Sequence, residues 1–493
     1  MSNKYILGID QSTQGTKALL FDKEGAIIER EDILHKQIIN ELGWVSHDPI
    51  EIYQNTIQVV KNIIEKTGID KTNIIGIGIS NQRETSVVWE RESGTPINQA
   101  IVWQCSRAID ICERVEHTGY AEMIRQHTGM NLSPYFPAAK MAWILEHVEG
   151  AKQKAEKGKL CFGTIDSWLI FKLTQGMSYK TDYSNASRTQ LFNIKELKWD
   201  DEVCKLFGID ISWLAQVCDS NSNFGTTDLE GLFETPIPIH GVLGDSHGAL
   251  FGQGCLQRGM IKTTYGTGSS IMMNIGENPV ISTHGVVTSL AWQMDGKVNY
   301  VLEGNVNYTG AVITWLKDDM QLIDTPEQTE QLANKAKKDD TLYLVPAFTG
   351  LGAPYWDSKA SASITGITRT TGKAEVVRAG LECIAYQIAD IVEAMSKDAD
   401  LEIKELRVDG GPTRNQYLMQ FQSDILGIDV QIPNAEELSG IGVAYAAGIA
   451  IGIYNQSIFE KIKRTKYSSV MSVEVREKKK HGWKAAVNQI LTR

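Results

Sequence analysis

Short apolar runs alternate with longer amphipathic periods in the N-terminal part of the chain. The apolar runs have the length of β-strands and lie at Ile6–Asp10, Ala18–Phe21, Ile74–Ser80 and Ser86–Trp89. Helical periods cover Pro49–Lys66 and Ser106–Glu116. Strands interleaved with amphipathic helices are typical of layered α/β domains. The pattern therefore predicts an α/β fold.

A polar turn joins the first two apolar runs, which predicts a tight β-hairpin with an exposed tip. Hydroxyl groups, a cation and small residues suit phosphate oxygens, and a carboxylate suits magnesium. The residues that supply these groups are Ser12, Thr13, Thr16, Lys17, Gly8, Gly15 and Asp10. An ordinary surface hairpin is rich in the same residue types, so this stretch alone leaves both interpretations open.

The same arrangement returns about 250 residues later, where residues 259–274 form a second apolar-turn-apolar segment with a Gly- and Thr-rich tip. A duplication of this size would place the two tips face to face across a cleft, and ligands favour such domain interfaces. We place the boundary after residue 252, which predicts domains 1–252 and 253–493. A further apolar segment, Ile441–Tyr454, carries three glycines and is too short to span a bilayer, so we expect a closely packed internal helix.

The composition narrows the possible partners. The 493 residues carry a formal net charge of −11, which gives no attraction to nucleic acid or to an anionic membrane. Seven scattered cysteines without a C-x-x-C pair favour reduced thiols and argue against a zinc site. Residues 1–4 lead into the first predicted strand without an apolar segment, so we expect no export signal and a cytoplasmic protein.

Asp245 follows an apolar run and opens a helix of small residues, so its carboxylate is predicted at a strand end beside a helix N-terminus. Such an aspartate often serves as an N-cap. It could instead be a general base that accepts a proton from an alcohol attacking a γ-phosphate, because phosphoryl transfer depends mostly on positioning and charge neutralisation.

Three other clusters carry candidate chemistry. Arg83 and Glu84 follow a predicted strand and offer forked donors and acceptors to hydroxyl groups, or they form a strand-terminal salt bridge. Trp103 and Tyr135 are either core aromatics or walls that face a sugar. The segment Leu406–Asn415 is a strand that ends in a double glycine, which allows close approach to a nucleotide or is a plain strand-to-helix turn.

Taken together, these residues resemble the FGGY family of carbohydrate kinases, which belong to the actin-like ATPase group. Matching motifs cover nearly the whole chain, at Gly43–Pro49, Asn81–Thr85, Val102–Cys105, Tyr135–Trp143, Thr181–Thr189, Ala347–Asp357 and Met419–Asp424. The resemblance implies two actin-like (ribonuclease H-like) ATPase domains with a cleft between them. It also implies ATP and Mg²⁺ as cofactors, and a homodimer.

The resemblance also implies roles for individual residues. Asp245 would be the catalytic base and, with Asp10, would lie near magnesium. The nucleotide would be bound by Thr13, Gln14, Gly15, Lys17, Thr267, Gly310, Thr314, Gly411 and Asn415. The polyol would be contacted by Arg83, Glu84, Trp103, Tyr135, Asp245, Ser246, His247 and Ser270.

The chain departs from the glycerol-phosphorylating members of the family at three of these positions. Those members usually carry two glutamines where this chain has Ser246 and His247, and an aromatic residue where it has Ser270. Loss of the aromatic wall weakens glycerol binding by a transfer term of about 1–3 kcal/mol, while added room and polar groups suit a four- or five-carbon polyol or ketose. His247 could donate a hydrogen bond to an extra hydroxyl group.

The sequence thus predicts an ATP-dependent kinase that phosphorylates a terminal hydroxyl of a small polyol or sugar. A pentulose or longer-polyol kinase, such as a xylulokinase, is the alternative within the family. An actin-like ATPase without a small-molecule acceptor is the alternative outside it, and it would explain the phosphate hairpins but not Arg83, Glu84, Trp103 and Tyr135.

Overall fold

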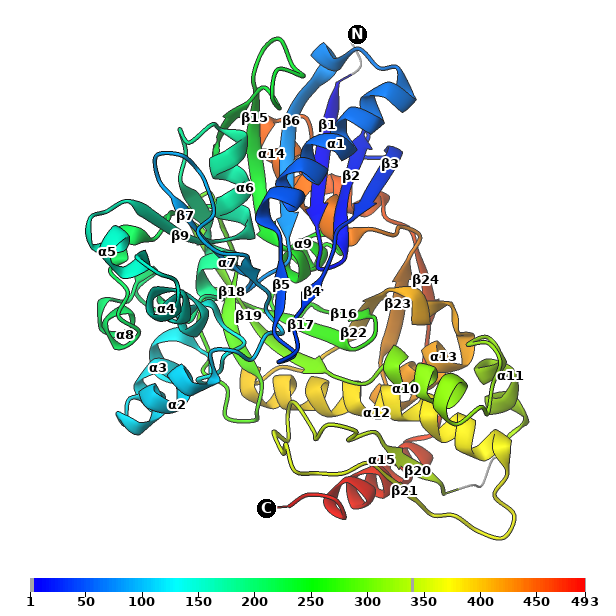
Figure 1. Ribbon diagram of the computed structural model, residues 1–493. Coiled ribbons are helices and arrows are strands. Elements are labelled where there is room, and N and C mark those ends of the chain that lie inside the picture. Colours follow the sequence, from blue (N-terminus) through cyan, green and yellow to red (C-terminus); the bar gives the residue numbers. More distant parts are fainter. Residues whose placement is uncertain (1–3, 338–340, 493) are drawn as a thin grey trace.

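Two large β-sheets, each with its own helices, organise the chain (Figure 1). The structure is a computed structural model that describes residues 4–337 and 341–492; residues 1–3, which enter the export-signal expectation, lie outside the described residues. The first sheet has the strand order β14 (Gly225–Thr227), β15 (Ile237–Gly244), β6 (Ile74–Asn81), β1 (Tyr5–Gln11), β2 (Gly15–Phe21) and β3 (Ile27–Leu34). The predicted α/β class is confirmed.

The second sheet repeats the topology of the first. Its strand order is β18 (Val287–Met294), β19 (Lys297–Val306), β17 (Ser269–Gly276), β16 (Ile261–Tyr265), β22 (Glu405–Asp409), β23 (Asp429–Pro433) and β24 (Arg464–Tyr467). The pair β16–β17 is antiparallel, and the pairs β16–β22 and β22–β23 are parallel. The corresponding pairs of the first sheet, β1–β2, β1–β6 and β6–β15, have the same directions. The second hairpin predicted from the sequence is therefore the counterpart of the first.

A third, smaller sheet lies beside the first and was not distinguished from the sequence. Its strand order is β4 (Ile38–Ile39), β5 (Val45–His47), β8 (Ala100–Ile101), β7 (Ser86–Glu90) and β9 (Leu160–Thr164). The helices on this side of the molecule are α2 (Ile109–His117), α3 (Ala121–Thr128), α4 (Pro137–His147), α5 (Ala151–Glu156) and α8 (Asp201–Leu206). They enclose a hydrophobic core of their own.

Helices cover the faces of the two large sheets. The predicted helix Pro49–Lys66 is α1 (Pro49–Thr67), which begins after Asp48, whose side chain accepts a hydrogen bond from the Ile50 amide, and ends at Gly68 in the left-handed conformation. The other helices are α6 (Ile165–Leu173), α7 (Tyr183–Ser187), α9 (Asp245–Gly252), α10 (Gly310–Thr314), α11 (Gln328–Lys335), α12 (Lys373–Ala399), α13 (Gln416–Leu426), α14 (Leu438–Ile451) and α15 (Val473–Asn488).

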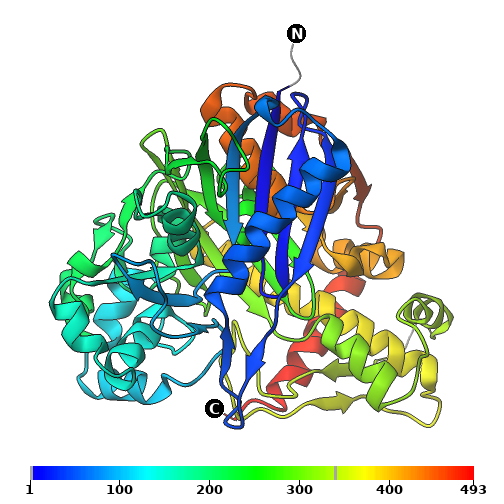
Figure 2. The same ribbon diagram turned by 45° about the horizontal axis from the view of Figure 1, so that its top comes forward.

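Helix α14 returns from the C-terminal half of the chain to the N-terminal sheet. It packs against α9, β6, β15 and β1, and both views show it behind the blue strands (Figure 2). It is almost entirely buried, so the predicted internal helix is confirmed. The core of the N-terminal sheet is therefore completed by residues beyond position 252, and the boundary between domains 1–252 and 253–493 stays a prediction.

Glycines let α9 and α14 cross at very short range. A Cβ atom on Gly442 would lie 1.9 Å from the carbonyl oxygen of Gly248, and one on Gly252 would lie 2.2 Å from the carbonyl oxygen of Leu438. Gly8, which the sequence suggested for close approach to phosphate, faces α14 instead. A Cβ atom on Gly8 would lie 2.8 Å from the Gly440 carbonyl oxygen. The close contacts that these glycines allow fix the position of α9 and of Asp245, its first residue.

Gly442→Ala is expected to lower the free energy of unfolding by about 1–3 kcal/mol, because the added methyl group overpacks the crossing of α9 and α14. Denaturant unfolding measures the change. Ala450→Ser, at a half-buried position of the same helix, is the control and should change stability much less. Equal stability of Gly442→Ala and the wild type would show that the two helices separate freely.

None of the helices in residues 4–337 and 341–492 combines the length and apolarity needed to cross a membrane. All seven cysteines are free thiols, and six of them are buried. The predicted homodimer stays a prediction.

Candidate functional site

A small cavity of about 170 Å³ lies where the N-terminal sheet, the small sheet and α9 meet. Seven residues line it: Thr13, Arg83, Glu84, Trp103, Tyr135, Asp245 and Ser246. Six of them belong to the acceptor residues expected from the sequence, although they come from segments more than 150 residues apart. The fold therefore brings most of the expected polyol-binding residues into one place.

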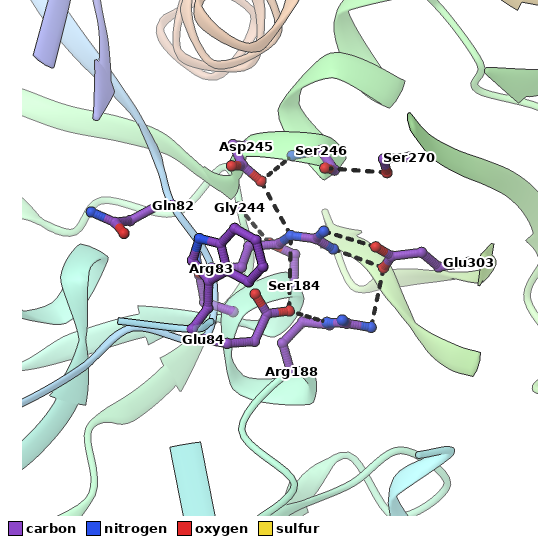
Figure 3. Close-up of polar contacts among 12 residues, drawn as sticks. Gln82, Arg83, Glu84, Ser184, Arg188, Gly244, Asp245, Ser246, Ser270 and Glu303 are labelled. Carbon is purple, nitrogen blue, oxygen red and sulfur yellow. Dashed lines mark hydrogen bonds and ion pairs between the residues drawn. The ribbon is translucent and has the colours of Figure 1, made fainter. Parts of the chain in front are cut away.

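A buried charge network lies behind this cavity (Figure 3). Arg83 donates two hydrogen bonds of 2.8 Å to the carboxylate of Glu303, one from each terminal nitrogen. Arg188 pairs with the same carboxylate at 3.1 Å and donates to Glu84 at 2.5 Å. A bidentate arginine–carboxylate pair fixes the plane of the guanidinium group. Arg83 is thus held rigidly toward the cavity.

The network keeps its carboxylate ionised. Burial alone would raise the pKa of Glu303, but the positive charges of Arg188 and Arg83 outweigh it and hold that pKa well below its usual range. The Glu303 side chain is fully buried. Two arginines and two glutamates therefore lie together without solvent, which makes each partner dependent on the others.

Asp245 begins α9 directly after Gly244, the last residue of β15, as the sequence predicts. Gly244 is the N-cap and Asp245 the first helical residue, so the N-cap interpretation of Asp245 is wrong. Its Oδ1 atom accepts a hydrogen bond of 2.6 Å from the Ser246 amide and forms an ion pair of 3.1 Å with Arg83 Nε. One third of the side chain, 33%, remains exposed toward the cavity.

Trp103 and Tyr135 form an aromatic wall of the cavity. Their ring centroids lie 5.5 Å apart, and the indole nitrogen of Trp103 donates a hydrogen bond of 2.9 Å to the Thr13 hydroxyl. Each ring is only partly buried. The sequence left open whether these aromatics belong to the core or to a wall. Both line the cavity, and Trp103 also contacts the first hairpin tip.

His247 lies behind the cavity and not on its wall. Its ring is fully buried, and among the described residues neither ring nitrogen has a hydrogen-bond partner. Burial, and then the nearby charge of Arg83, lower the pKa of His247 far below its usual value, so the ring is neutral. The suggested hydrogen bond from His247 to a substrate hydroxyl is not supported by this position.

A second cavity, of about 680 Å³, lies in the C-terminal half. It is lined by all five residues that the sequence analysis assigned to the nucleotide there: Thr267, Gly310, Thr314, Gly411 and Asn415. Apolar side chains of Ile313, Leu381, Ile384 and Leu418 complete its wall. A cavity with an apolar side and a glycine-bordered mouth suits a nucleotide base and ribose.

The first hairpin tip faces a cleft between the two halves. Thr13 and Gln14 line a cavity of about 1010 Å³ together with Thr267 from the second hairpin. The amide of Ser12 donates a hydrogen bond of 2.8 Å to the Gly15 carbonyl and closes the turn. A Cβ atom on Gly15 would lie 2.5 Å from the Ile33 carbonyl oxygen, so this glycine is required by the neighbouring strand.

Two carboxylates and a lysine lie at the other side of the hairpin. Asp10, Lys17 and Asp409 line a cavity of about 620 Å³. Burial raises the pKa of Asp10 to about 6, although the Ser80 hydroxyl donates to its carboxylate at 2.8 Å. Lys17 forms an ion pair of 2.7 Å with Glu437, just before α14. In the described part of the chain, no group of three or more metal-ligating side chains is present.

Several residues of the site were not predicted from the sequence. Arg188 and Asp409 lie inside motifs that were recognised, but nothing in their local pattern indicated their roles. Glu437 carries no local signal. Glu303 directly follows the apolar residues Val301 and Leu302 of β19, and a charged residue beside such a run is the one sequence feature that could have indicated a buried ion pair.

The fold and the site define a class of protein: an ATPase of two repeated α/β halves that carries a carboxylate and a small polar cavity at the cleft between them. The chain belongs to the FGGY family of carbohydrate kinases. The model of the family's N-terminal domain matches residues 5–252, and the model of its C-terminal domain matches residues 261–451. The protein is therefore an ATP-dependent phosphotransferase that acts on a small polyol or carbohydrate.

Several glycerol kinases are similar to this chain. Glycerol kinase 1 of Thermotoga maritima is 49% identical, with 99% of this chain and 100% of that protein covered. The glycerol kinase of Alkaliphilus oremlandii is 47% identical, with 99% and 97% covered. The crystal structure of Plasmodium falciparum glycerol kinase with ADP superimposes with a TM-score of 0.95 at 36% identity, covering 100% of this chain and 99% of the other. These relatives favour a glycerol-kinase-like enzyme over a xylulokinase.

Proposed function

We propose that this protein transfers the γ-phosphoryl group of ATP, bound with Mg²⁺, to a terminal hydroxyl group of a small polyol, with Asp245 as the general base. The observation that carries the proposal is the place of Asp245. It lines both the 170 Å³ cavity and the larger cleft that contains the two hairpin tips. A hydroxyl group beside Asp245 would therefore face the phosphates.

The acceptor is held by groups of complementary chemistry. Arg83 supplies donors and Glu84 acceptors, so together they suit neighbouring hydroxyl groups. Tyr135 and Trp103 supply aromatic surface against the carbon–hydrogen side of the polyol. Because Glu303 and Arg188 fix Arg83 and Glu84, the cavity is preorganised before the acceptor binds.

The chemical step requires little covalent chemistry from the protein. Asp245 accepts the proton of the attacking hydroxyl group as the new oxygen–phosphorus bond forms, and ADP leaves from the opposite side. The N-terminus of α9 and the Arg83 guanidinium hold the carboxylate in one orientation. The protein then contributes mainly alignment of the acceptor with the γ-phosphate.

The residues around Asp10 fit a magnesium ion that arrives with the nucleotide. Mg²⁺ is usually bound by one or two carboxylates, water and phosphate oxygens, so a complete shell of protein ligands is not required. Asp10 is a buried carboxylate whose raised pKa marks a place where a cation would favour the ionised form. Asp10 and Asp245 are the candidate ligands, and the ion would neutralise charge on the phosphates.

The nucleotide would lie along the C-terminal half, with its base and ribose in the 680 Å³ cavity and its phosphates toward the hairpin tips. Thr267 lines both this cavity and the central cleft, which supports a continuous path between them. Thr13 and Gln14 lie on the opposite side of the same cleft. The phosphates would therefore be contacted from both halves of the protein.

An acceptor screen tests the proposal. ADP release is measured with ATP and Mg²⁺ in the presence of glycerol, erythritol, xylitol, xylulose, ribulose or gluconate at equal concentration, and without acceptor. We expect at least one small polyol to raise the rate far above the acceptor-free rate, and EDTA to abolish the increase. The same slow rate in every mixture would favour an ATPase without a small-molecule acceptor and would contradict the proposal.

Lys17→Met is expected to raise the KM for ATP by about 10- to 100-fold, because a hydrogen bond to a charged group is worth about 1.5–3 kcal/mol. The acceptor KM should change little. Lys23→Met, which removes an exposed lysine just beyond the same hairpin, is the matched control and should behave like the wild type. If Lys17→Met altered the acceptor KM and left that for ATP unchanged, Lys17 would not contact phosphate.

A further inference from the structure

The acceptor cavity continues into a polar wall on the C-terminal sheet. The 170 Å³ cavity and the 1010 Å³ cleft share Thr13, Trp103, Tyr135 and Asp245, so the two spaces adjoin. Ser270 and Asn305 line the cleft beyond Asp245. An acceptor that fills the small cavity could therefore extend toward these two side chains.

Strand register places these side chains in one row. Asp409 pairs with Thr264, Thr264 with Ser270, and Ser270 with Asn305, across β22, β16, β17 and β19. Directly paired residues in a sheet point to the same face. The row runs from the carboxylate Asp409, beside the proposed phosphate and metal site, to Asn305 at its other end.

The same face of β19 already serves the acceptor cavity. Glu303 and Asn305 are two residues apart on this strand, so their side chains lie on the same side of the sheet. Glu303 reaches across to hold Arg83. Asn305 therefore faces the same space as the residues that bind the acceptor.

The polar groups at this end of the row are available for a ligand. Within residues 4–337 and 341–492, the Asn305 amide has no hydrogen-bond partner, and the Ser270 hydroxyl reaches only the Ser246 hydroxyl, at a long 3.4 Å. Figure 3 shows Ser246 and Ser270 beside Asp245 and above the Arg83–Glu303 pair. Two hydroxyls and an amide each donate and accept, which matches a row of hydroxyl groups.

The wall also favours a neutral ligand. Among the described residues that line the 1010 Å³ cleft, Asp245 is the one acidic side chain, and no lysine or arginine is present. Ser246, Ser270 and Asn305 carry no positive charge, so a carboxylate at the distal end of a sugar acid would find no ion-pair partner among these three side chains. Uncharged hydroxyl groups meet no such penalty.

Resting on the function proposed above, we propose that Ser246, Ser270 and Asn305 form a subsite for the distal hydroxyl groups of an uncharged linear polyol of four or five carbons. Glycerol fills only the part of the site next to Arg83, Glu84 and Asp245. A tetritol or pentitol occupies both parts, with its terminal hydroxyl at Asp245. The protein therefore prefers the longer polyol.

Steady-state kinetics with glycerol, erythritol and xylitol, and with gluconate as the charged acceptor, test the proposal. For the wild type, kcat/KM for erythritol or xylitol should exceed that for glycerol, and gluconate should be poorest. Asn305→Ala and Ser270→Phe should each lower kcat/KM for the longer polyol by about 10–200-fold, the range expected when one pocket contact changes. Asn305→Ala should leave kcat/KM for glycerol within about threefold, whereas Ser270→Phe restores an aromatic wall and should raise it.

Asn299→Ala is the matched control, because Asn299 is a half-buried asparagine at the far end of the same strand. It should leave all four acceptors unchanged. Asn305→Ala removes atoms without adding bulk, so it keeps the test decisive if Ser270→Phe does not fold.

The outcomes separate this inference from the proposed function. Glycerol as the best acceptor of the wild type, or equal losses for glycerol and the longer polyol in Asn305→Ala, would overturn the subsite while leaving a polyol kinase. A wild type that phosphorylates none of the acceptors would contradict the proposed function itself.

Discussion

Asp245→Asn is expected to lower kcat for phosphoryl transfer by about 10²–10⁴-fold, the usual contribution of a general base. Asparagine has nearly the same shape but cannot accept the proton of the attacking hydroxyl group. The binding of ADP should remain close to that of the wild type, because Asp245 lies outside the 680 Å³ cavity. Single-turnover kinetics and ADP titration measure the two quantities.

Asp201→Asn is the matched control for this variant. Asp201 is the first residue of α8, as Asp245 is the first residue of α9, but it is exposed and remote from the cavities. It should retain full turnover. Near-normal turnover of Asp245→Asn would remove Asp245 from the role of base, and weakened ADP binding would indicate a disturbed fold rather than a lost proton acceptor.

Glu303→Gln is expected to lower the free energy of unfolding by about 3–5 kcal/mol, the cost of removing one partner from a buried ion pair. The variant leaves Arg83 and Arg188 buried with one carboxylate fewer. It should also raise the acceptor KM, because Arg83 loses its bidentate partner. Denaturant unfolding and acceptor kinetics measure these effects.

Glu146→Gln, which removes an exposed pair with Arg114, is the control and should cost less than about 1 kcal/mol. The pH dependence gives a second check. Since the folded-state pKa of Glu303 is depressed, its stabilisation is present above the ordinary glutamate value of 4.5 and is lost as the pH falls below it. The stability difference between wild type and Glu303→Gln should therefore shrink in acid; a constant difference would point to packing alone.

The elements of the fold were largely predictable. The strands Ile6–Asp10 and Ile74–Ser80, the helix Pro49–Lys66 and the second hairpin appear close to their predicted bounds. Periodicity reports which side chains are buried within one element, and this information is local. The position of Asp245 was predictable for the same reason, because a strand end followed by small residues is a local pattern.

Motif resemblance added the roles of residues that the local pattern left open. Arg83, Glu84, Trp103 and Tyr135 each had a structural alternative, and the fold gathers all four around one cavity. Their identity as substrate contacts stays a prediction.

Only the tertiary structure decided which distant groups meet. Glu303 lies 220 positions from Arg83, and α14 returns to a sheet formed by the first part of the chain. Gly8 and Gly15 were assigned to phosphate by residue type, and only the tertiary structure shows their close contacts with α14 and β3. The phosphate contact of Gly15 stays a prediction.

His247 and Asn305 show the same limit of prediction from local sequence at the site. A histidine two residues after Asp245 suggests a substrate contact, yet the turn of α9 directs it into the core. An asparagine near the end of a strand of mixed polarity suggests nothing, yet strand register sets Asn305 beside Ser270 at the cleft. The sequence by itself determined the elements and the type of chemistry, since both depend on neighbours along the chain. The partners of each charge and the shape of the acceptor wall depend on long-range packing, which no local pattern encodes.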